Sequence, residues 1–173
     1  MTAGPINPTN LNTLKGASTV AIKTGDKIEN LSLYDSEKEL RNINEWSGKR
    51  VLIAFFPGAF TGVCDNELCS LDSFSSFLDD LDAAVIGVSV DSPFVLKNWS
   101  EQTKTNITFL SDYNREWIDH LGVEFNDLGG LSGYRVANRV VIIIEADCTV
   151  SYRWDPERPG VLQDYDALKP KLP

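Results

Sequence analysis

Residues 50–64 read RVLIAFFPGAFTGVC, and this stretch carries the strongest indication of the fold. The run from Arg50 to Phe56 is almost wholly apolar, which is typical of a strand buried on both faces of a sheet. A Pro-Gly pair then ends the strand, and the residues that follow have the three- and four-residue apolar spacing of a helix. The sequence therefore predicts a buried strand, a tight loop and a helix that begins near Cys64.

The position of Cys64 favours a reactive thiol. The first turn of a helix presents backbone N–H groups without intrahelical partners and the positive end of the helix dipole, and both lower the pKa of a cysteine there. Pro57 stiffens the loop, Gly58 lets the backbone approach a small ligand, and Thr61 places a hydroxyl one helical turn before the sulfur. We therefore expect Cys64 to be catalytic; the alternative is a small buried apolar residue, as most free cysteines are.

A fixed positive charge is expected beside this thiol, since a thiolate at a helix end needs one to be strongly activated. Arg139 is the candidate, because it precedes the most apolar segment of the chain, residues 140–144, and should stand near the end of a central strand. The alternative is an arginine on the surface that flanks a hydrophobic strand.

Composition indicates one soluble domain. The chain has 173 residues, 42% of them hydrophobic, which is enough to bury a full core without disulfides. We expect residues 20–173 to form this domain and residues 1–19, rich in Pro, Asn, Thr and Gly, to form a weakly ordered arm. Three cysteines are an odd number, and no stretch resembles a signal peptide or membrane span, so a cytoplasmic protein with free thiols is predicted. The net charge of −9 opposes binding to nucleic acid or anionic lipid.

The remaining apolar pattern alternates between strands and helices. Strands are predicted at 31–34, 83–90, 108–110, 139–145 and 149–154, and helices from 92, over 113–121 and over 160–168. This order predicts an α/β fold, in which helices flank a central mixed sheet and a hairpin adds an antiparallel edge. Gly129, Gly130 and Gly133 lack the spacing of a phosphate-binding loop and are expected to form a flexible loop.

Several motifs lie in the register of the peroxiredoxins. The pattern Pro-x-x-x-Thr-x-x-Cys at 57–64 resembles their peroxidatic loop, and weaker matches recur at 25–26, 48–50, 91–93, 110–112 and 137–139. The chain thus resembles the AhpC/TSA superfamily, with its thioredoxin-like fold, and within it the one-cysteine AhpE-like group. This resemblance places Pro57, Thr61, Cys64 and Arg139 at the four active-site positions, and Glu67 where glutamate is common.

The resemblance implies a reaction and its partners. The Cys64 thiolate would attack a hydroperoxide and become a sulfenic acid, while Thr61, backbone N–H groups and Arg139 bind the departing oxygen and Pro57 shields the sulfur. A thioredoxin, a glutaredoxin or a low-molecular-weight thiol would then reduce the sulfenic acid. The resemblance calls for no metal, flavin or haem cofactor. It implies a homodimer or higher homo-oligomer through the face near the loop, where Phe60 and Phe94 are plausible contributors.

The two other cysteines leave alternatives open. Cys69 has the spacing of the resolving cysteine of the PrxQ group, yet five residues on a helix separate the Cα atoms by about 8.5 Å, whereas disulfides rarely span more than about 7 Å. A Cys64–Cys69 bond would therefore require the helix to unwind, and Cys69 is either resolving or simply packed. Cys148 stands in a turn where the family usually has glycine, and either Asp147 or Cys148 must supply any positive φ. It is a tolerated turn residue or an exposed thiol that pairs between subunits.

Three other activities are alternatives to a peroxidase. A thiol-disulfide oxidoreductase would need Cys-x-x-Cys, whereas the chain has Cys64-Asp65-Asn66-Glu67. A peroxide sensor or holdase would stall after one equivalent of peroxide instead of turning over. A Cys-His protease is not expected, because His120, the only histidine, lies on a predicted helix far from the loop and favours a structural or surface role.

Overall fold

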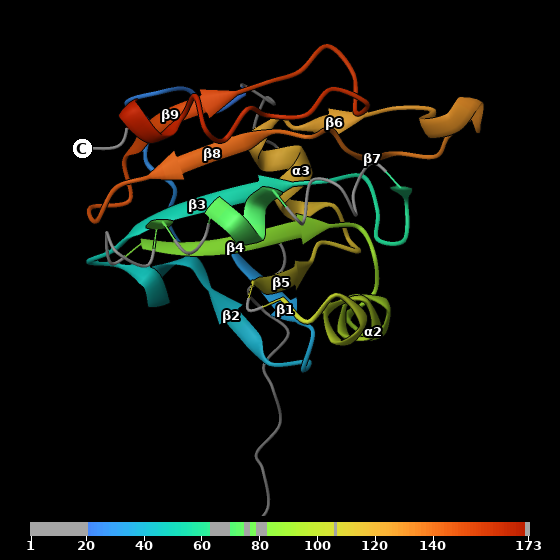
Figure 1. Cartoon of the computed structure of the whole chain (residues 1–173). Coiled ribbons are helices and arrows are strands. Elements are labelled where there is room, and N and C mark those ends of the chain that lie inside the picture. The colour runs from blue at the N-terminus through green and yellow to red at the C-terminus, as the bar shows by residue number, and fades with distance from the viewer. Residues whose placement is uncertain (1–20, 63–69, 75–76, 79–82, 106, 172–173) are drawn as a thin grey trace, which may run out of the picture.

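A computed structural model describes residues 21–62, 70–74, 77–78, 83–105 and 107–171. Within this part of the chain a seven-stranded mixed sheet runs in the order β2-β1-β5-β4-β3-β8-β9 (Figure 1). The strands are β1 Ser32–Asp35, β2 Leu40–Asn42, β3 Arg50–Phe55, β4 Ala83–Ser89, β5 Thr108–Ser111, β8 Val141–Ile144 and β9 Val150–Trp154. The prediction of a mixed α/β sheet is confirmed, and the predicted arm over 1–19 lies outside the described residues.

The sheet is parallel in its centre and antiparallel toward its edges. β3 pairs in parallel with β4, which pairs in parallel with β5. On its other side β3 pairs antiparallel with β8, and β8 and β9 form the expected hairpin. The carboxyl ends of β3, β4 and β5 therefore meet the amino end of β8 at one edge of the sheet.

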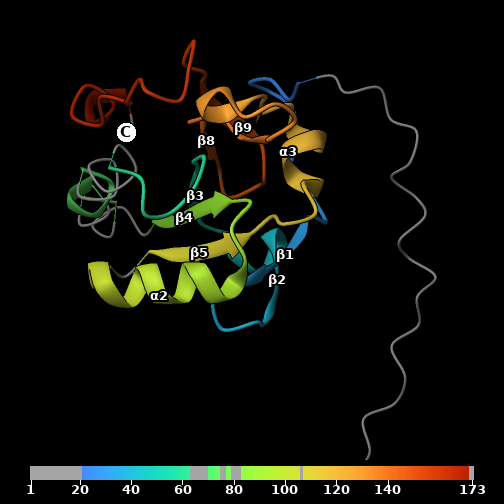
Figure 2. The same ribbon diagram turned by 90° about the vertical axis from the view of Figure 1, so that its right-hand side faces the viewer.

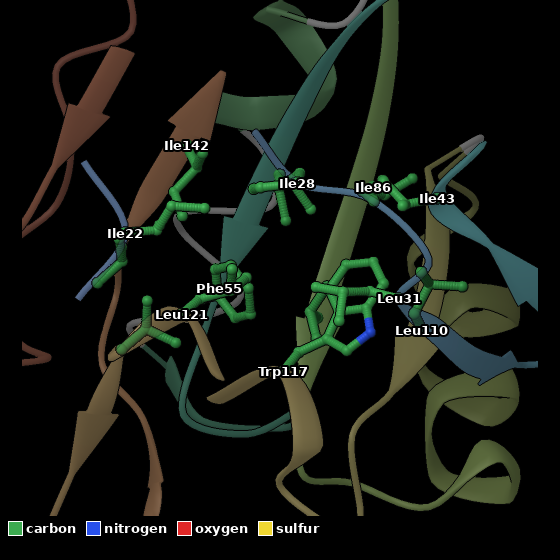
Figure 3. Packing of buried hydrophobic residues seen from close by; sticks show 14 of the residues in the cluster. Ile22, Ile28, Leu31, Ile43, Phe55, Ile86, Leu110, Trp117, Leu121 and Ile142 are labelled. Carbon is green, nitrogen blue, oxygen red and sulfur yellow. The ribbon is translucent and has the colours of Figure 1, made fainter. Parts of the chain in front are cut away.

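Both faces of the sheet are covered by a hydrophobic cluster. Successive side chains along β3 point to opposite faces, so they join the two clusters alternately. Val51, Ile53 and Phe55 join one core cluster, and Leu52, Ala54 and Phe56 join the other. The first cluster includes α3 (Glu116–Leu121), and Figure 3 shows Phe55 between its residues Leu121 and Trp117. The second includes α2 (Pro93–Thr103), which Figure 2 shows running alongside β5, and the helical residues 70–74 and 77–78.

The local sequence signals explain the helices. Ser92 is the N-cap of α2, accepts a hydrogen bond from the Val95 backbone N–H at 3.4 Å, and is followed by Pro93 at the first helical position. α3 begins at Glu116, three residues after the predicted start, because Arg115 before it adopts a left-handed conformation with φ 63°. Its residues Trp117, Ile118 and Leu121 are buried. In the described part of the chain, no helix is long and apolar enough to cross a membrane.

The helix predicted over 160–168 is wrong. Residues 161–164 have no regular structure, and the chain forms only a turn before a 3₁₀ helix at Lys169–Lys171. Of the large apolar residues in this segment only Tyr165 and Leu168 are buried, whereas Val161 and Leu162 are exposed, so a helix over this short stretch would gain too little packing to be stable. Sequence reasoning also missed β2, the 3₁₀ helices Ile43–Trp46 and Leu128–Gly130, and the small pair of β6 (Glu124–Phe125) and β7 (Val136–Ala137).

Candidate active site

The loop that leads to Cys64 leaves the sheet at the edge where the parallel strands end. The Phe55 N–H donates to the Val140 carbonyl at 2.8 Å, and the Phe56 N–H donates to the Val88 carbonyl at 3.0 Å. These bonds extend the pairing of β3 as far as Pro57, which is buried together with Gly58. Figure 1 shows β3, β4 and β5 ending on the same side. The candidate site therefore begins between the end of β4 and the start of β8.

The loop itself is held by short polar contacts. The Ala59 N–H donates to Oδ2 of Asp91 at 2.7 Å, and the Thr61 hydroxyl donates to the Gly58 carbonyl at 3.3 Å. Phe60 between them adopts a left-handed conformation, with φ 59°, and half of its side chain is exposed. Thr61 is exposed at the end of this turn, so its hydroxyl is accessible from solvent.

Asp91 belongs to a polar network that joins three strand ends. Its Oδ2 also accepts a hydrogen bond from the Ser89 hydroxyl at 2.9 Å, and its backbone N–H donates to the same hydroxyl oxygen at 3.2 Å. The buried Ser111 hydroxyl, at the end of β5, donates to the Asp91 carbonyl. In the sequence Asp91 stands out only within the weak family match at 91–93, which does not indicate this link to the loop.

Arg139 is buried at the same edge. It lies directly before Val140, whose carbonyl is bonded to β3, and only 1% of it is exposed, so the alternative of a surface charge is wrong. Its Nε donates to the Pro159 carbonyl, and the neighbouring Asn138 side chain donates to the Pro156 carbonyl at 2.9 Å. Two contacts thus hold the segment after β9 against this arginine. Nothing in the local sequence indicated that segment as a partner.

A second carboxylate at this edge is Asp112, which the sequence marks only as the end of the weak family match at 110–112, with no role assigned to it. Its oxygens accept hydrogen bonds from the backbone N–H groups of Glu116 at 2.7 Å and Ile118 at 2.8 Å, which ties the end of β5 to the start of α3. Burial raises the pKa of Asp112 to about 7, against the effect of these N–H donors, which favour the ionised form. Asp112 therefore fixes α3, the helix that carries Trp117.

The other expected site residues are separated from this edge or lie outside the described residues. Cys64, Glu67 and Cys69 are outside them. Cys148 lies in the β8–β9 turn and supplies the positive φ itself, at 65°, instead of Asp147. Only 7% of Cys148 is exposed, so the alternative of an exposed thiol pairing between subunits is wrong. His120 is exposed in the last turn of α3.

The described residues contain no group of three or more His, Cys, Asp and Glu side chains that could hold a metal ion. The groups that the structure gathers at this edge are a proline, a hydroxyl, backbone N–H groups and a buried guanidinium. Fixed donors of this kind can stabilise a negative charge that develops on an oxygen beside them.

Comparison with known proteins assigns this arrangement to a family. Residues 24–153 match the model of the AhpC/TSA family. Peroxiredoxin Bcp of Escherichia coli is 31% identical over 136 residues, which cover 78% of this chain and 86% of that protein. Alkyl hydroperoxide reductase E of Mycobacterium tuberculosis is 30% identical over 149 residues, which cover 83% of this chain and 91% of the relative.

The solved structures agree on the fold. A PrxQ mutant from Xylella fastidiosa superposes with a TM-score of 0.78 over 88% of this chain and 96% of that one, at 16% identity. The expected thioredoxin-like fold is therefore confirmed. Since the family model spans most of the chain and both relatives are about as long as their matches, the protein belongs to the AhpC/TSA family of peroxiredoxins.

Proposed function

We propose that this protein is a thiol-dependent peroxidase in which Cys64 is the reacting group. The observation that carries the proposal is that the 57–62 loop and buried Arg139 both adjoin the Phe55–Val140 pairing at one edge of the sheet, in a chain whose family match spans both segments. Pro57, Thr61 and Arg139 are the residues proposed to surround the sulfur.

The chemistry assigns each group a role. The Cys64 thiolate attacks the distal oxygen of the hydroperoxide, so an S–O bond forms while the O–O bond breaks. Sulfur is oxidised to a sulfenic acid, and the other oxygen leaves with the bonding electrons, takes up a proton and departs as water or an alcohol. Donors from Arg139 and the loop backbone act on the leaving oxygen, where negative charge grows only as the bond breaks. The Thr61 hydroxyl has one hydrogen, which it donates to the Gly58 carbonyl in this structure, and it acts as a donor to the leaving oxygen once it turns away from that carbonyl.

Recycling requires a thiol. A first thiol condenses with the sulfenic acid to release water and form a disulfide. If that thiol is external, a second external thiol displaces it and restores the Cys64 thiol. A disulfide within the chain takes two external thiols, which leave joined to each other as a disulfide. Cys69 is the candidate for the first thiol within the chain, and a thioredoxin, a glutaredoxin or a small thiol is the candidate outside it. The proposed compartment is the cytoplasm, because an odd number of cysteines in a chain of this size fits a reducing environment.

Peptide-resolved mass spectrometry after one equivalent of hydrogen peroxide tests the proposal. We expect one added oxygen on Cys64, or a Cys64–Cys69 disulfide if Cys69 resolves, and we expect Cys64→Ser to abolish peroxide consumption with a thiol reductant present. Unchanged consumption by Cys64→Ser would reject the assignment. A wild-type protein that stalls after one equivalent despite excess thiol would favour the sensor or holdase alternative.

The assembly proposed is a homodimer or higher homo-oligomer through the surface beside the loop. Phe94 is 70% exposed and Phe60 is 50% exposed, which is unusual for large aromatic side chains on a surface. Light scattering of the wild type and of Phe94→Glu tests this: the charge should shift the mass toward the monomer, and a wild type that is already monomeric would reject it.

A further inference from the structure

We propose that Asp91 is a positioning residue for the peroxide reaction: its carboxylate fixes the 57–61 loop in the conformation that the reaction needs. The inference rests on the proposed function, since it concerns the geometry of the same site. Asp91 acts through the loop and touches no reacting atom.

The contacts of Asp91 show that it serves the loop. One backbone donor and one side-chain donor bind the same carboxylate oxygen of Asp91. Oδ2 accepts from the Ala59 N–H at 2.7 Å and from the Ser89 hydroxyl at 2.9 Å. The helix that follows does not need this carboxylate, because Ser92 caps α2. A side chain at the end of β4 is thus used to hold a loop 32 residues earlier in the chain.

Asp91 is itself held rigidly. Its backbone N–H donates to the Ser89 hydroxyl, and its carbonyl accepts a hydrogen bond from the Ser111 hydroxyl. Ser89 and Ser111 are fully buried in neighbouring strands. The ends of β4 and β5 therefore fix the position of the carboxylate. The hydrogen bond from the Ala59 N–H in turn fixes the loop to the carboxylate.

The backbone of the same segment also runs close to the Asp91 carboxylate. A Cβ atom at Gly58 would lie 3.6 Å from Oδ2 and 3.8 Å from Oδ1 of Asp91, which is ordinary van der Waals contact. The backbone at Gly58 thus lies close beside the carboxylate, and its carbonyl accepts the hydrogen bond from Thr61. If Asp91 is lost, the turn from Gly58 to Thr61 loses its anchor, and the Thr61 hydroxyl loses its fixed place relative to the sheet edge.

Substitutions separate the position of the loop from the charge of Asp91. Asn keeps one oxygen that can accept both converging donors, so Asp91→Asn should preserve the loop, whereas Asp91→Ala removes the anchor. Asp147→Ala is the matched control, because Asp147 also accepts a backbone N–H, from Thr149 at 3.0 Å, but lies in the β8–β9 turn at the far end of the sheet.

The experiment compares two reactions of Cys64 followed by peptide-resolved mass spectrometry: oxidation by hydrogen peroxide and alkylation by iodoacetamide. Alkylation needs the thiolate but not the donors around the leaving oxygen, so it controls for thiol exposure and pKa. We expect Asp91→Ala to slow oxidation about 10- to 100-fold, the size expected for displaced catalytic groups, with alkylation changed less than about threefold. Asp91→Asn and Asp147→Ala should both stay within about threefold of wild type in oxidation.

Hydrogen exchange of the Ala59 amide gives an independent readout, expected to quicken in Asp91→Ala and to stay slow in Asp91→Asn. The inference is overturned if Asp91→Ala oxidises at the wild-type rate, if alkylation falls as much as oxidation, or if Asp91→Asn is as slow as Asp91→Ala. A wild-type Cys64 that reacts with peroxide no faster than a free thiol overturns the proposed function instead, so the two failures are distinct.

Discussion

Gly87→Ala should destabilise the protein, because β4 has no room for a methyl group at this position. A Cβ atom there would lie 2.7 Å from two ring carbons of Phe109 and 3.3 Å from the ring of Phe56. These rings cannot withdraw freely: Trp99 packs on Phe109 at 5.0 Å between centroids and on Phe56 at 5.1 Å. Phe109 and Trp99 are each only 2% exposed.

The expected cost follows from two opposing effects. Forcing an extra carbon into a packed core costs about 1–3 kcal/mol, whereas replacing glycine by alanine inside a strand regains about 0.5–1 kcal/mol. The free energy of unfolding should therefore fall by about 0–2.5 kcal/mol, and by about 1 kcal/mol at the middle of the two ranges. Since Phe56 directly precedes Pro57, a displaced Phe56 ring should also disturb the loop and slow oxidation of Cys64.

Urea denaturation followed by far-ultraviolet circular dichroism measures this change. Gly160→Ala is the matched control, because a Cβ atom there meets nothing within 4 Å and the φ of Gly160 lies outside the left-handed region. We expect a lower midpoint for Gly87→Ala alone. If the two variants unfold at the same urea concentration, the reasoning about the close approach of these rings is wrong.

Three further changes probe the candidate site and its support. Arg139→Lys keeps the charge but cannot reproduce the guanidinium donor to the Pro159 carbonyl. Oxidation measured by stopped flow should therefore slow about 100-fold, and the free energy of unfolding should fall by about 1–3 kcal/mol. Oxidation at the wild-type rate would contradict the role of Arg139. Burial raises the pKa of Asp112 to about 7, above its value of about 4 in the unfolded chain. Between these two pH values the folded state binds one more proton than the unfolded state, so the free energy of unfolding should decline as pH rises from about 4 to about 7. Asp112→Asn should remove that decline, on the order of 1–4 kcal/mol, in urea titrations across this range, and an identical pH profile for both proteins would refute the shift. Arg153→Met should cost about 2–3 kcal/mol, measured in the same way, because the Arg153 guanidinium donates to three backbone carbonyls around the end of α3; unchanged stability would show that those carbonyls are satisfied without it.

The parts of this fold that could be predicted are those in which a local pattern and the tertiary structure demand the same residues. β3 is buried on both faces, so its sequence is almost continuously apolar, and the Pro-Gly pair marks where it ends. The place of Arg139 followed similarly, since it precedes the strand that pairs antiparallel with β3. By contrast, the predicted last helix is wrong because apolar spacing alone did not reveal that Val161 and Leu162 would stay exposed.

The rest of the candidate site depends on contacts between distant segments, which spacing does not encode. Asp91 reaches Ala59 across 32 residues, and Arg139 reaches Pro159 across 20. A polar residue at a strand end is equally typical of a cap, a turn or a solvated surface, so its partner depends on how the strands are ordered in the sheet. One signal was available: a glycine inside a buried strand, as at Gly87, indicates a close approach by another group.

The sheet register bears directly on how an oxidised Cys64 would be reduced. Val51 pairs with Ile144 at one end of β3, and Cys148 lies just beyond Ile144 in the turn, whereas the 57–62 loop leaves from the other end. Six strand residues separate these ends by about 20 Å, far beyond the Cα separation of about 7 Å that a disulfide tolerates. Cys148 is also buried, so a mixed disulfide would have to displace core residues. Because the loop leaves from the end of β3 opposite to Cys148, we expect the reduction within one subunit to use Cys69 or an external thiol, and Cys148→Ala should leave steady-state peroxide turnover within about twofold of wild type. A Cys64–Cys148 crosslinked peptide from monomeric protein would show that the sheet opens during the cycle and would refute this argument.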